Sequence, residues 1–189
     1  MPELESAHIT LFGNFNPYLI SPEWLDEQEI WNARDVKLAL GAVKSDGVLF
    51  NGEGTEWFVS SDRLVIASTV LDCGEMALKV LKELPHTPMT AVGANFEFQD
   101  NTDERTYPVF EAIRETIPTK VNPQLLRWGV VLHEGGARIE VMLIQGDHGT
   151  TLAFNHNRTT ASHADACKAV SLFSEDHDRS VSLMKQFLS

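Results

Sequence analysis

The chain has 189 residues, of which 43% are hydrophobic and 22% are charged, a composition typical of a protein with a packed core. Its 27 acidic and 15 basic residues give a formal net charge of −12 at pH 7. Such a surface repels phosphate backbones, so direct nucleic-acid binding is not expected. No apolar run approaches the roughly 18 residues of a membrane-spanning helix, so a membrane is not an expected partner either.

The first part of the chain is strongly acidic. Residues 1–33 contain six acidic side chains and no lysine or arginine. A secretory signal would instead be basic and then apolar, so the sequence predicts a cytoplasmic protein. In a reducing compartment Cys73 and Cys167, which form no CxxC pair, are expected to be buried thiols and not a disulfide.

Residues 9–15 are mostly apolar and predict the first strand, after which Ser21 and Pro22 predict the start of a helix. A serine hydroxyl suits the N-cap position, and proline at the first helical position gives up no hydrogen bond. Trp24 and Trp31 are expected on this short helix, seven residues apart among acidic side chains. Either both rings pack against the sheet, or they form a partner-binding face with a charged rim.

Glycine-bearing turns predict a run of three hairpin-connected strands, and the run occurs twice. Residues 47–54 and 129–136 are each an apolar segment that ends in such a turn, and two more short apolar strands follow each of them. Gly135 and Gly136 are expected to supply the positive φ of the second turn. They do not belong to a nucleotide-binding loop, because neither glycine-rich phosphate motif is present.

Each run of strands is followed by a predicted helix. Residues 72–75 resemble a capping box, and the apolar stripe that follows them ends at Pro85. In the second copy Ser162 begins the helix, and further helical turns reach the C-terminus. The second copy also opens with a strand at residues 89–95 and a helix from Pro108, which Pro118 ends.

The same order of elements therefore occurs twice, with offsets between the copies of 80 to 90 residues. The sequence predicts an α+β protein of two pseudo-symmetric β-α-βββ-α repeats, residues 1–85 and 86–189, of which the second has an extended C-terminal helix. The repeats are expected to form one compact unit, a curved and mostly antiparallel sheet with the helices on one face.

This order of elements resembles the TATA-box-binding-protein-like fold, whose saddle consists of two β-α-β-strand-α repeats. The resemblance covers most of the chain and concerns element order alone, so it implies a fold and no activity. The basic character of the DNA-binding members is absent here.

Residue types that can ligate metals are concentrated late in the chain. His163 and Cys167 are four residues apart on a predicted helix, so they project from one face. However, Cys167 also fits the buried boundary of that helix, and no H-E-x-x-H or C-x-x-C motif is present. The sequence predicts no metal and no cofactor. It leaves open whether the possible ligands of this region meet in the folded protein: His148, His156, His163 and Cys167, with Asp147 and Asp165.

No serine, threonine or cysteine stands in a nucleophile motif, so no catalytic residue is assigned. The prediction is a non-enzymatic protein-interaction or adaptor protein that binds another protein or itself. Its candidate surface residues are Trp24 and Trp31 on the helix, and Thr10, Asn14 and His133 on the open face of the sheet.

Two other functions are compatible with the sequence. One is a small-ligand-binding protein or an enzyme with a site between the two repeats. The other is an acidic mimic that inhibits a nucleic-acid-handling protein by occupying its basic groove.

Overall fold

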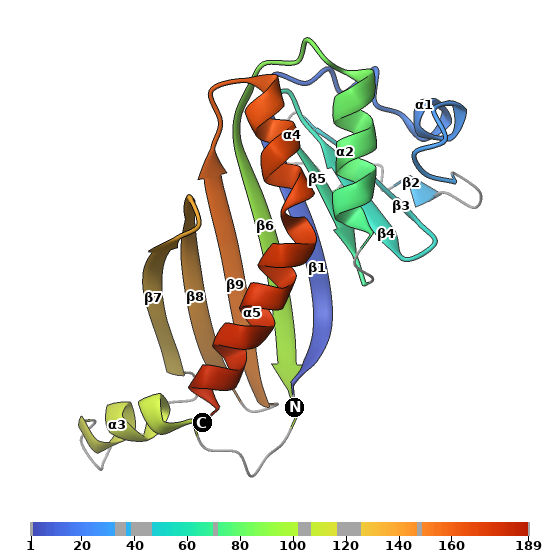
Figure 1. Ribbon diagram of the computed structural model, residues 1–189. Helices are drawn as coiled ribbons and strands as arrows, with labels where there is room; N and C mark the ends of the chain where they lie inside the picture. Colours follow the sequence, from blue (N-terminus) through green and yellow to red (C-terminus); the bar gives the residue numbers. More distant parts are fainter. Residues whose placement is uncertain are drawn as a thin grey trace.

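A computed structural model describes residues 2–32, 37–38, 47–69, 72–101, 107–116, 126–146 and 149–188. These residues form nine strands in one sheet and five helices (Figure 1). The strands are β1 (Glu3–Gly13), β2 (Lys37–Leu38), β3 (Val48–Gly52), β4 (Thr55–Val59), β5 (Arg63–Ser68), β6 (Met89–Asp100), β7 (Leu126–Glu134), β8 (Ala137–Gly146) and β9 (Gly149–Thr159). The helices are α1 (Pro22–Glu27), α2 (Cys73–Glu83), α3 (Pro108–Thr116), α4 (His163–Ser171) and α5 (Phe173–Phe187).

The sheet is antiparallel at every described pairing, and its strand order is β2-β3-β4-β5-β1-β6-β9-β8-β7. The two opening strands β1 and β6 therefore lie side by side in the middle. The hairpins that follow each of them extend to opposite edges. The predicted α+β class with an antiparallel sheet is confirmed.

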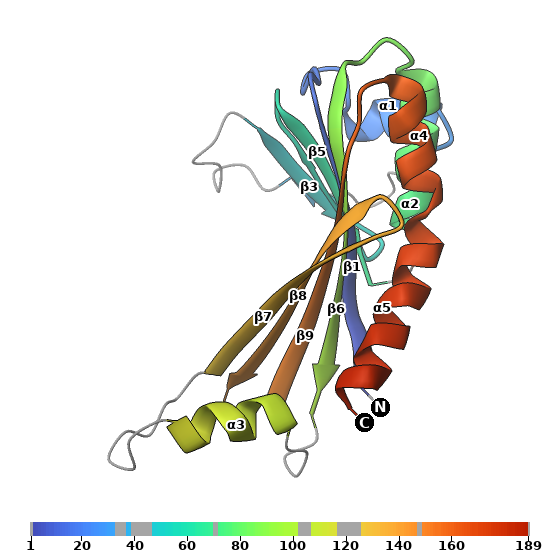
Figure 2. The same ribbon diagram turned by 60° about the vertical axis from the view of Figure 1, so that its left-hand side comes forward.

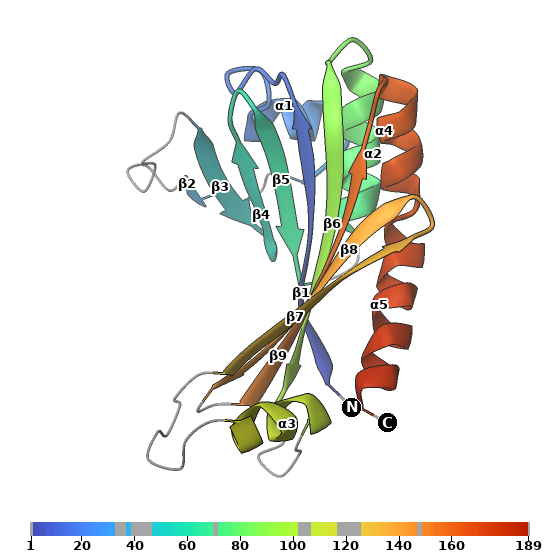
Figure 3. The ribbon, with the colours of Figure 1, turned by 90° about the vertical axis from the view of Figure 1, so that its left-hand side faces the viewer.

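One side of the sheet carries the helices. Figures 2 and 3 show α2, α4 and α5 along the same side, with α3 at one end of the long strands. Along β1 the side chains of Ala7, Ile9 and Leu11 are fully buried on this side. The Cys73 thiol at the start of α2 lies 3.8 Å from the carbonyl oxygen of Ala7, which places α2 directly over β1. The alternation of two residues per repeat thus buries one face of the strand under the helices.

The helix starts follow the predicted capping rules in two cases and depart from them in one. Ser21 accepts a hydrogen bond from the backbone nitrogen of Trp24 at 3.2 Å, and Ser162 accepts one from that of Asp165 at 3.1 Å. Asp72 is the N-cap of α2 but makes no side-chain cap bond, so the predicted capping box is wrong. The reason is local, because the helical ψ of −13° at Asp72 departs from the extended backbone of a capping residue.

The predicted helix for the two tryptophans is too long. Helix α1 ends at Glu27, and Glu29 turns the chain with a φ of 54°, so Trp31 lies beyond the helix. The turn glycines behave as predicted, with φ values of 57° at Gly135 and 75° at Gly136. Pro118, the predicted end of the helix that begins at Pro108, lies outside the described residues.

The predicted extended C-terminal helix is two helices in the structure, since α4 ends at Ser171 and α5 continues for 15 residues from Phe173. Within the described part of the chain, none of the helices combines the length and the apolar character that crossing a membrane requires.

Candidate functional site

The face of the sheet opposite the helices is called here the open face. Figures 2 and 3 show no helix of the described residues lying across it. Pairing register assigns its residues, because side chains directly opposite on neighbouring strands point to the same side. Starting from Thr10, which lies opposite Val65 on β5 and Gly93 on β6, the open face continues through Asn157 on β9, Arg138 on β8 and His133 on β7.

Large apolar side chains are exposed at the outer end of this face. Val131 on β7 is 45% exposed and Met142 on β8 is 39% exposed. They lie close together, because Val131 pairs with Glu140 and Gly129 pairs with Met142. Together with their neighbours they form the β7–β8 patch, whose members are Arg127, Val131, His133, Arg138, Glu140 and Met142.

The charge of the β7–β8 patch differs from that of the whole chain. Two arginines and one glutamate lie in it, whereas the chain as a whole carries a net charge of −12. Arg138 forms an ion pair with Glu140 on the same strand. The patch is thus an apolar centre with a slightly basic rim on an otherwise acidic protein.

The centre of the open face is polar, and it includes the carboxylate of Glu97 on β6. A methyl group at Gly93 would lie 3.1 Å from the amide oxygen of Asn157, so this carboxamide covers the glycine, with Asn95 and Asn155 close by. His8 lies opposite Asn95 on β1. Burial lowers the pKa of His8, and the nearby Glu97 carboxylate raises it by less. The pKa is therefore below its usual value, and the ring is neutral at pH 7.

The sequence-predicted surface residues lie in separate places. Thr10 and His133 are both on the open face, but β6, β9 and β8 separate their strands, and Thr10 is buried, contrary to the prediction of a surface residue. Asn14 is exposed just beyond the end of β1, where its backbone nitrogen donates to the carbonyl of Pro88 at 3.0 Å. Trp24 is half-buried on α1 and packs against the core.

Trp31 packs as a core residue. Its side chain is 8% exposed, and its ring centroid lies 6.0 Å from that of Phe50 and 5.9 Å from that of Trp57. The packing interpretation therefore holds for Trp31, which is not available as an exposed anchor.

The possible metal ligands do not converge where the structure describes them. Within the described ranges no three His, Cys, Asp or Glu side chains lie close enough to hold a metal ion. His156 is buried on the helix side of β9, while His163 and Cys167 lie on α4. His148 and Asp147 lie outside the described residues.

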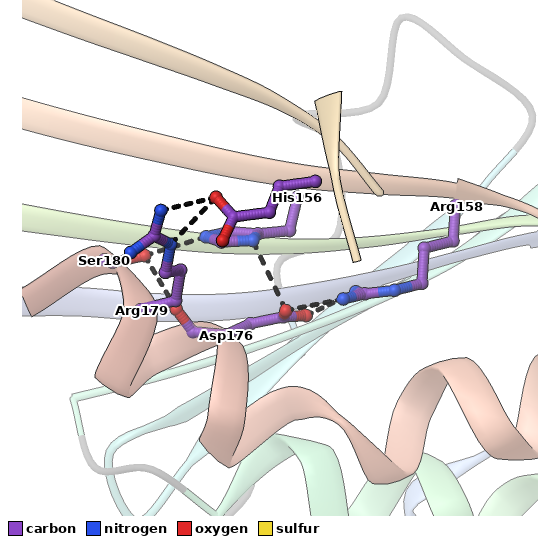
Figure 4. A network of polar contacts seen from close by, with 6 residues as sticks. His156, Arg158, Asp176, Arg179 and Ser180 are labelled. Atoms are coloured by element: carbon purple, nitrogen blue, oxygen red, sulfur yellow. Dashed lines mark hydrogen bonds and ion pairs between the residues drawn. The ribbon is translucent and has the colours of Figure 1, made fainter. Parts of the chain in front are cut away.

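A buried polar network joins β9 to α5 (Figure 4). The Nδ1 atom of His156 lies 3.3 Å from an oxygen of Asp176, and its Nε2 atom lies 2.9 Å from the Ser180 hydroxyl. Arg158 reaches the same carboxylate with both terminal nitrogens, at 2.5 and 2.6 Å. On the neighbouring turn of α5, Arg179 forms an ion pair with Glu134 at the end of β7.

The order Ser180–His156–Asp176 has the connectivity of a catalytic triad, but its position excludes that chemistry. A triad serine must meet a substrate carbonyl, and Ser180 is 0% exposed while His156 is 1% exposed. The Ser180 hydroxyl also donates to the backbone carbonyl of Asp176 at 2.9 Å, one helical turn earlier. The network therefore holds α5 against the sheet.

The carboxylate of Asp176 is the centre of this network. Burial raises the pKa of Asp176, but the hydrogen bonds from His156 and Arg158 outweigh burial and hold this pKa below its usual value. The group is therefore ionised at neutral pH and bound to donors on two sides.

Sequence reasoning missed this network. A signal exists in the spacing of α5, where Asp176 and Ser180 fall between the buried Phe173 and Leu183 on one helical stripe. Polar residues within an apolar stripe indicate a buried polar contact. The sequence does not say with which strand that contact is made.

Two hollows lie beside the hairpin turns. One, of about 610 Å³, is next to the β3–β4 turn, and Ser6, Glu53, Glu56 and Thr69 are among its lining residues. The other, of about 470 Å³, is next to the β7–β8 turn and includes His133, Arg138, Asn157 and Thr159. Both are open to solvent and bring together no buried charged groups.

The chain matches no protein-family model, and no curated protein is significantly similar to it. What can be inferred about its function therefore depends on the geometry described above.

Proposed function

We propose that this protein is a non-enzymatic interaction protein that binds another protein through the open face, with the β7–β8 patch at the centre of the contact. The observation that supports this is the one-sided covering of the sheet: α2, α4 and α5 pack on one face (Figure 2), and the other exposes Val131 and Met142 side by side. Adjacent exposed apolar side chains with a polar rim are typical of interaction sites.

The patch indicates what a partner presents. Val131 and Met142 supply an apolar centre, and Met adapts to different contact surfaces because its side chain is unbranched and polarizable. Arg127 at the rim suits carboxylates or backbone carbonyls, whereas Arg138 is already paired with Glu140. At physiological salt, charges beyond about 8 Å are screened, so this local pattern counts for more than the net charge of the chain. The partner is thus a protein surface with apolar side chains between acceptor groups.

We also propose that residues 1–85 and 86–189 are copies of one β-α-βββ-α unit, arranged as in the TATA-box-binding-protein-like fold. Strand pairing supports this. Ile66 on β5 lies opposite both Ile9 on β1 and Trp57 on β4, and His156 on β9 lies opposite both Ala94 on β6 and Ile139 on β8.

The hollows support the same relationship, because each lies between a hairpin turn and the strand that follows that hairpin. An experimental structure in which residues 1–85 and 89–175 superimpose element by element would support the duplication. Halves that do not superimpose would contradict it.

The interaction proposal is tested with two double variants of equal added charge. Val131→Glu with Met142→Glu places two carboxylates in the apolar centre, and Ala164→Glu with Ser174→Glu places two on exposed positions of α4 and α5. All three proteins are immobilised, exposed to lysate of the native host, and compared for stoichiometric binding. Thermal unfolding first establishes that both variants are folded.

We expect one partner protein to bind the wild type and the variant with glutamates on α4 and α5 (the helix-side variant). The same partner should not bind the variant with glutamates at positions 131 and 142 (the patch variant). Absence of a stoichiometric partner would overturn the proposal, as would a partner that both variants lose equally or that only the helix-side variant loses.

A further inference from the structure

We infer that the outer edge of β7 pairs with the same edge of a second copy of this chain, so that two sheets join into one across a two-fold axis. This goes beyond the proposed function, because the contact is made by the backbone of the edge strand, with Val131 as the residue of the β7–β8 patch that lies on the axis. The inference depends on the length, the sequence and the pairing pattern of β7.

The two edges of the sheet differ. On one side it ends in β2, which has two residues in the described part of the chain. On the other side the outermost strand among the described residues is β7, which has nine residues and pairs with β8 without a register shift over its whole length. A long, regular edge strand presents a row of unpaired backbone donors and acceptors, and such a row is a template for another strand.

The middle of β7 lacks the usual protection of an edge, because its charged side chains, Arg127 and Glu134, lie near the ends of the strand. Proteins blunt edge strands with lysine, proline, a bulge or an inward-pointing charge. The strand LRWGVVLHE contains neither lysine nor proline, and it has no bulge. Val131 is exposed on one face, and Trp128, Val130 and Leu132 are half-buried on the other. Both faces of the edge are therefore apolar near its middle.

The hairpin geometry shows which backbone groups point outward. Gly135 and Gly136 form a two-residue turn, both with positive φ, so the flanking residues Glu134 and Ala137 bond to each other. Alternation then directs the backbone groups of Gly129, Val131 and His133 away from β8. These groups are the ones that a second strand can reach.

A second copy fits this edge well. An antiparallel pair centred on Val131 places Val131 opposite its own copy, Gly129 opposite His133, and Val130 opposite Leu132. Each of the outward-facing pairs then exchanges two backbone hydrogen bonds. Apolar residues meet apolar residues on both faces, and no two like charges lie directly opposite each other. A two-fold contact of this kind is self-complementary and closes at the dimer.

A matched pair of substitutions at Gly129 tests the inference. Gly129→Pro removes an outward-pointing N–H and adds a ring, which an edge strand tolerates on its solvent side. Gly129→Ala keeps the N–H. Sedimentation equilibrium of the full chain is expected to show a dimer for the wild type and for Gly129→Ala. Gly129→Pro is expected to raise the dimer dissociation constant by at least about tenfold, since it removes the hydrogen bond donated by this N–H in each of the two copies.

Disulfide trapping tests the register independently of folding effects. Val131→Cys places two thiols opposite each other at the axis, within reach of a disulfide, whereas His133→Cys places them several residues apart. Only the former is expected to give a covalent dimer on mild oxidation. The native Cys73 is buried, but Cys167 is only half-buried, against the expectation that both thiols are buried, so both cysteine variants also carry Cys167→Ala.

Three results would overturn the inference: a monomer at all concentrations up to millimolar, a dimer that Gly129→Pro leaves unchanged, or equal trapping by both cysteine variants. The outcome is separate from that of the interaction proposal, because a dimer does not require a second kind of partner.

Discussion

Strands β5 and β9 occupy corresponding places beside the central pair of strands, yet they contact the helices in different ways. On β5 the helix-side residues Leu64 and Ile66 are apolar and fully buried. On β9 the helix-side residues include His156 and Arg158, which bind the buried Asp176 of α5. The chain thus uses two kinds of contact to hold a helical layer on one sheet.

The difference indicates what each contact contributes. Apolar burial stabilises the packing of a helix on the sheet but does not fix where along a strand the helix lies. The hydrogen bonds of Asp176 require one position of α5 along β9. Taking the charges of Asp176 and Arg158 out of water carries a desolvation cost that their pairing offsets. We therefore expect β5 to tolerate apolar changes of similar volume, and β9 to be sensitive to the loss of a single partner.

The largest expected effect follows Asp176→Ala. This change leaves His156 and Arg158 buried without their carboxylate, and removing one partner of a buried ion pair costs about 3–5 kcal/mol. Urea unfolding measures the loss. Asp178→Ala is the matched control, because the side chain of Asp178 is 85% exposed and pairs with the neighbouring His177, so its loss is expected to stay within about 0.5 kcal/mol. Equal losses for the two variants would contradict the network.

The next largest effect is expected from Ile66→Ala on β5. Ile66 is fully buried, and removing its side chain costs transfer free energy and leaves a cavity, together about 3 kcal/mol. Ile66→Val is expected to cost only about 1 kcal/mol. The comparison between β5 and β9 fails if the conservative change costs as much as the deletion.

A smaller effect is expected at the contact between α2 and α5. Gly74 is buried, and a methyl group there would lie 2.8 Å from Cβ of Phe173 at the start of α5. Gly74→Ala would ordinarily favour a helix, but the close contact must push the two helices apart, at a net cost of about 1 kcal/mol. Glu75→Ala, at an exposed position on the same turn, is the control. A gain in stability for Gly74→Ala would show that the helices separate freely.

The smallest expected effect is on the pH dependence of stability, because burial opposes the hydrogen bonds that lower the pKa of Asp176. A carboxyl with a lowered pKa in the folded state stabilises the fold fully above its unfolded pKa. This stabilisation is lost as the pH falls through the folded pKa. Between pH 6 and pH 2 the wild type is expected to lose more stability than Asp176→Asn. Parallel curves for the two proteins would contradict this prediction.

Local features of the fold were predictable from the sequence because their causes are local. Gly135 and Gly136 have positive φ values, which glycine adopts more favourably than other residues do. Ser21 and Ser162 cap the helices that follow them. The same reasoning failed at Trp31, because the turn before it depends on a positive φ at Glu29, a residue type that gives no such signal.

Features that depend on register were only partly predictable. Thr10 and His133 point to the same face of the sheet, since alternation along a strand assigns them once one core residue is known, but the burial of Thr10 does not follow from alternation. His156 lies on β9 and Asp176, which it contacts, lies on α5. A connecting segment and helix α4 separate these two elements along the chain. No spacing in the sequence specifies that meeting, and the exposure of Val131 follows only from the position of β7 at the edge.

Site-specific photo-cross-linking tests the role of the open face most directly. A benzophenone side chain replaces Met142 in one protein and the highly exposed Asp178 of α5 in another, and both are irradiated in cells of the native host. The account predicts that the probe at position 142 yields a covalent product with a second kind of protein and that the probe at position 178 does not. A product from position 178 alone, or from neither position, would contradict it.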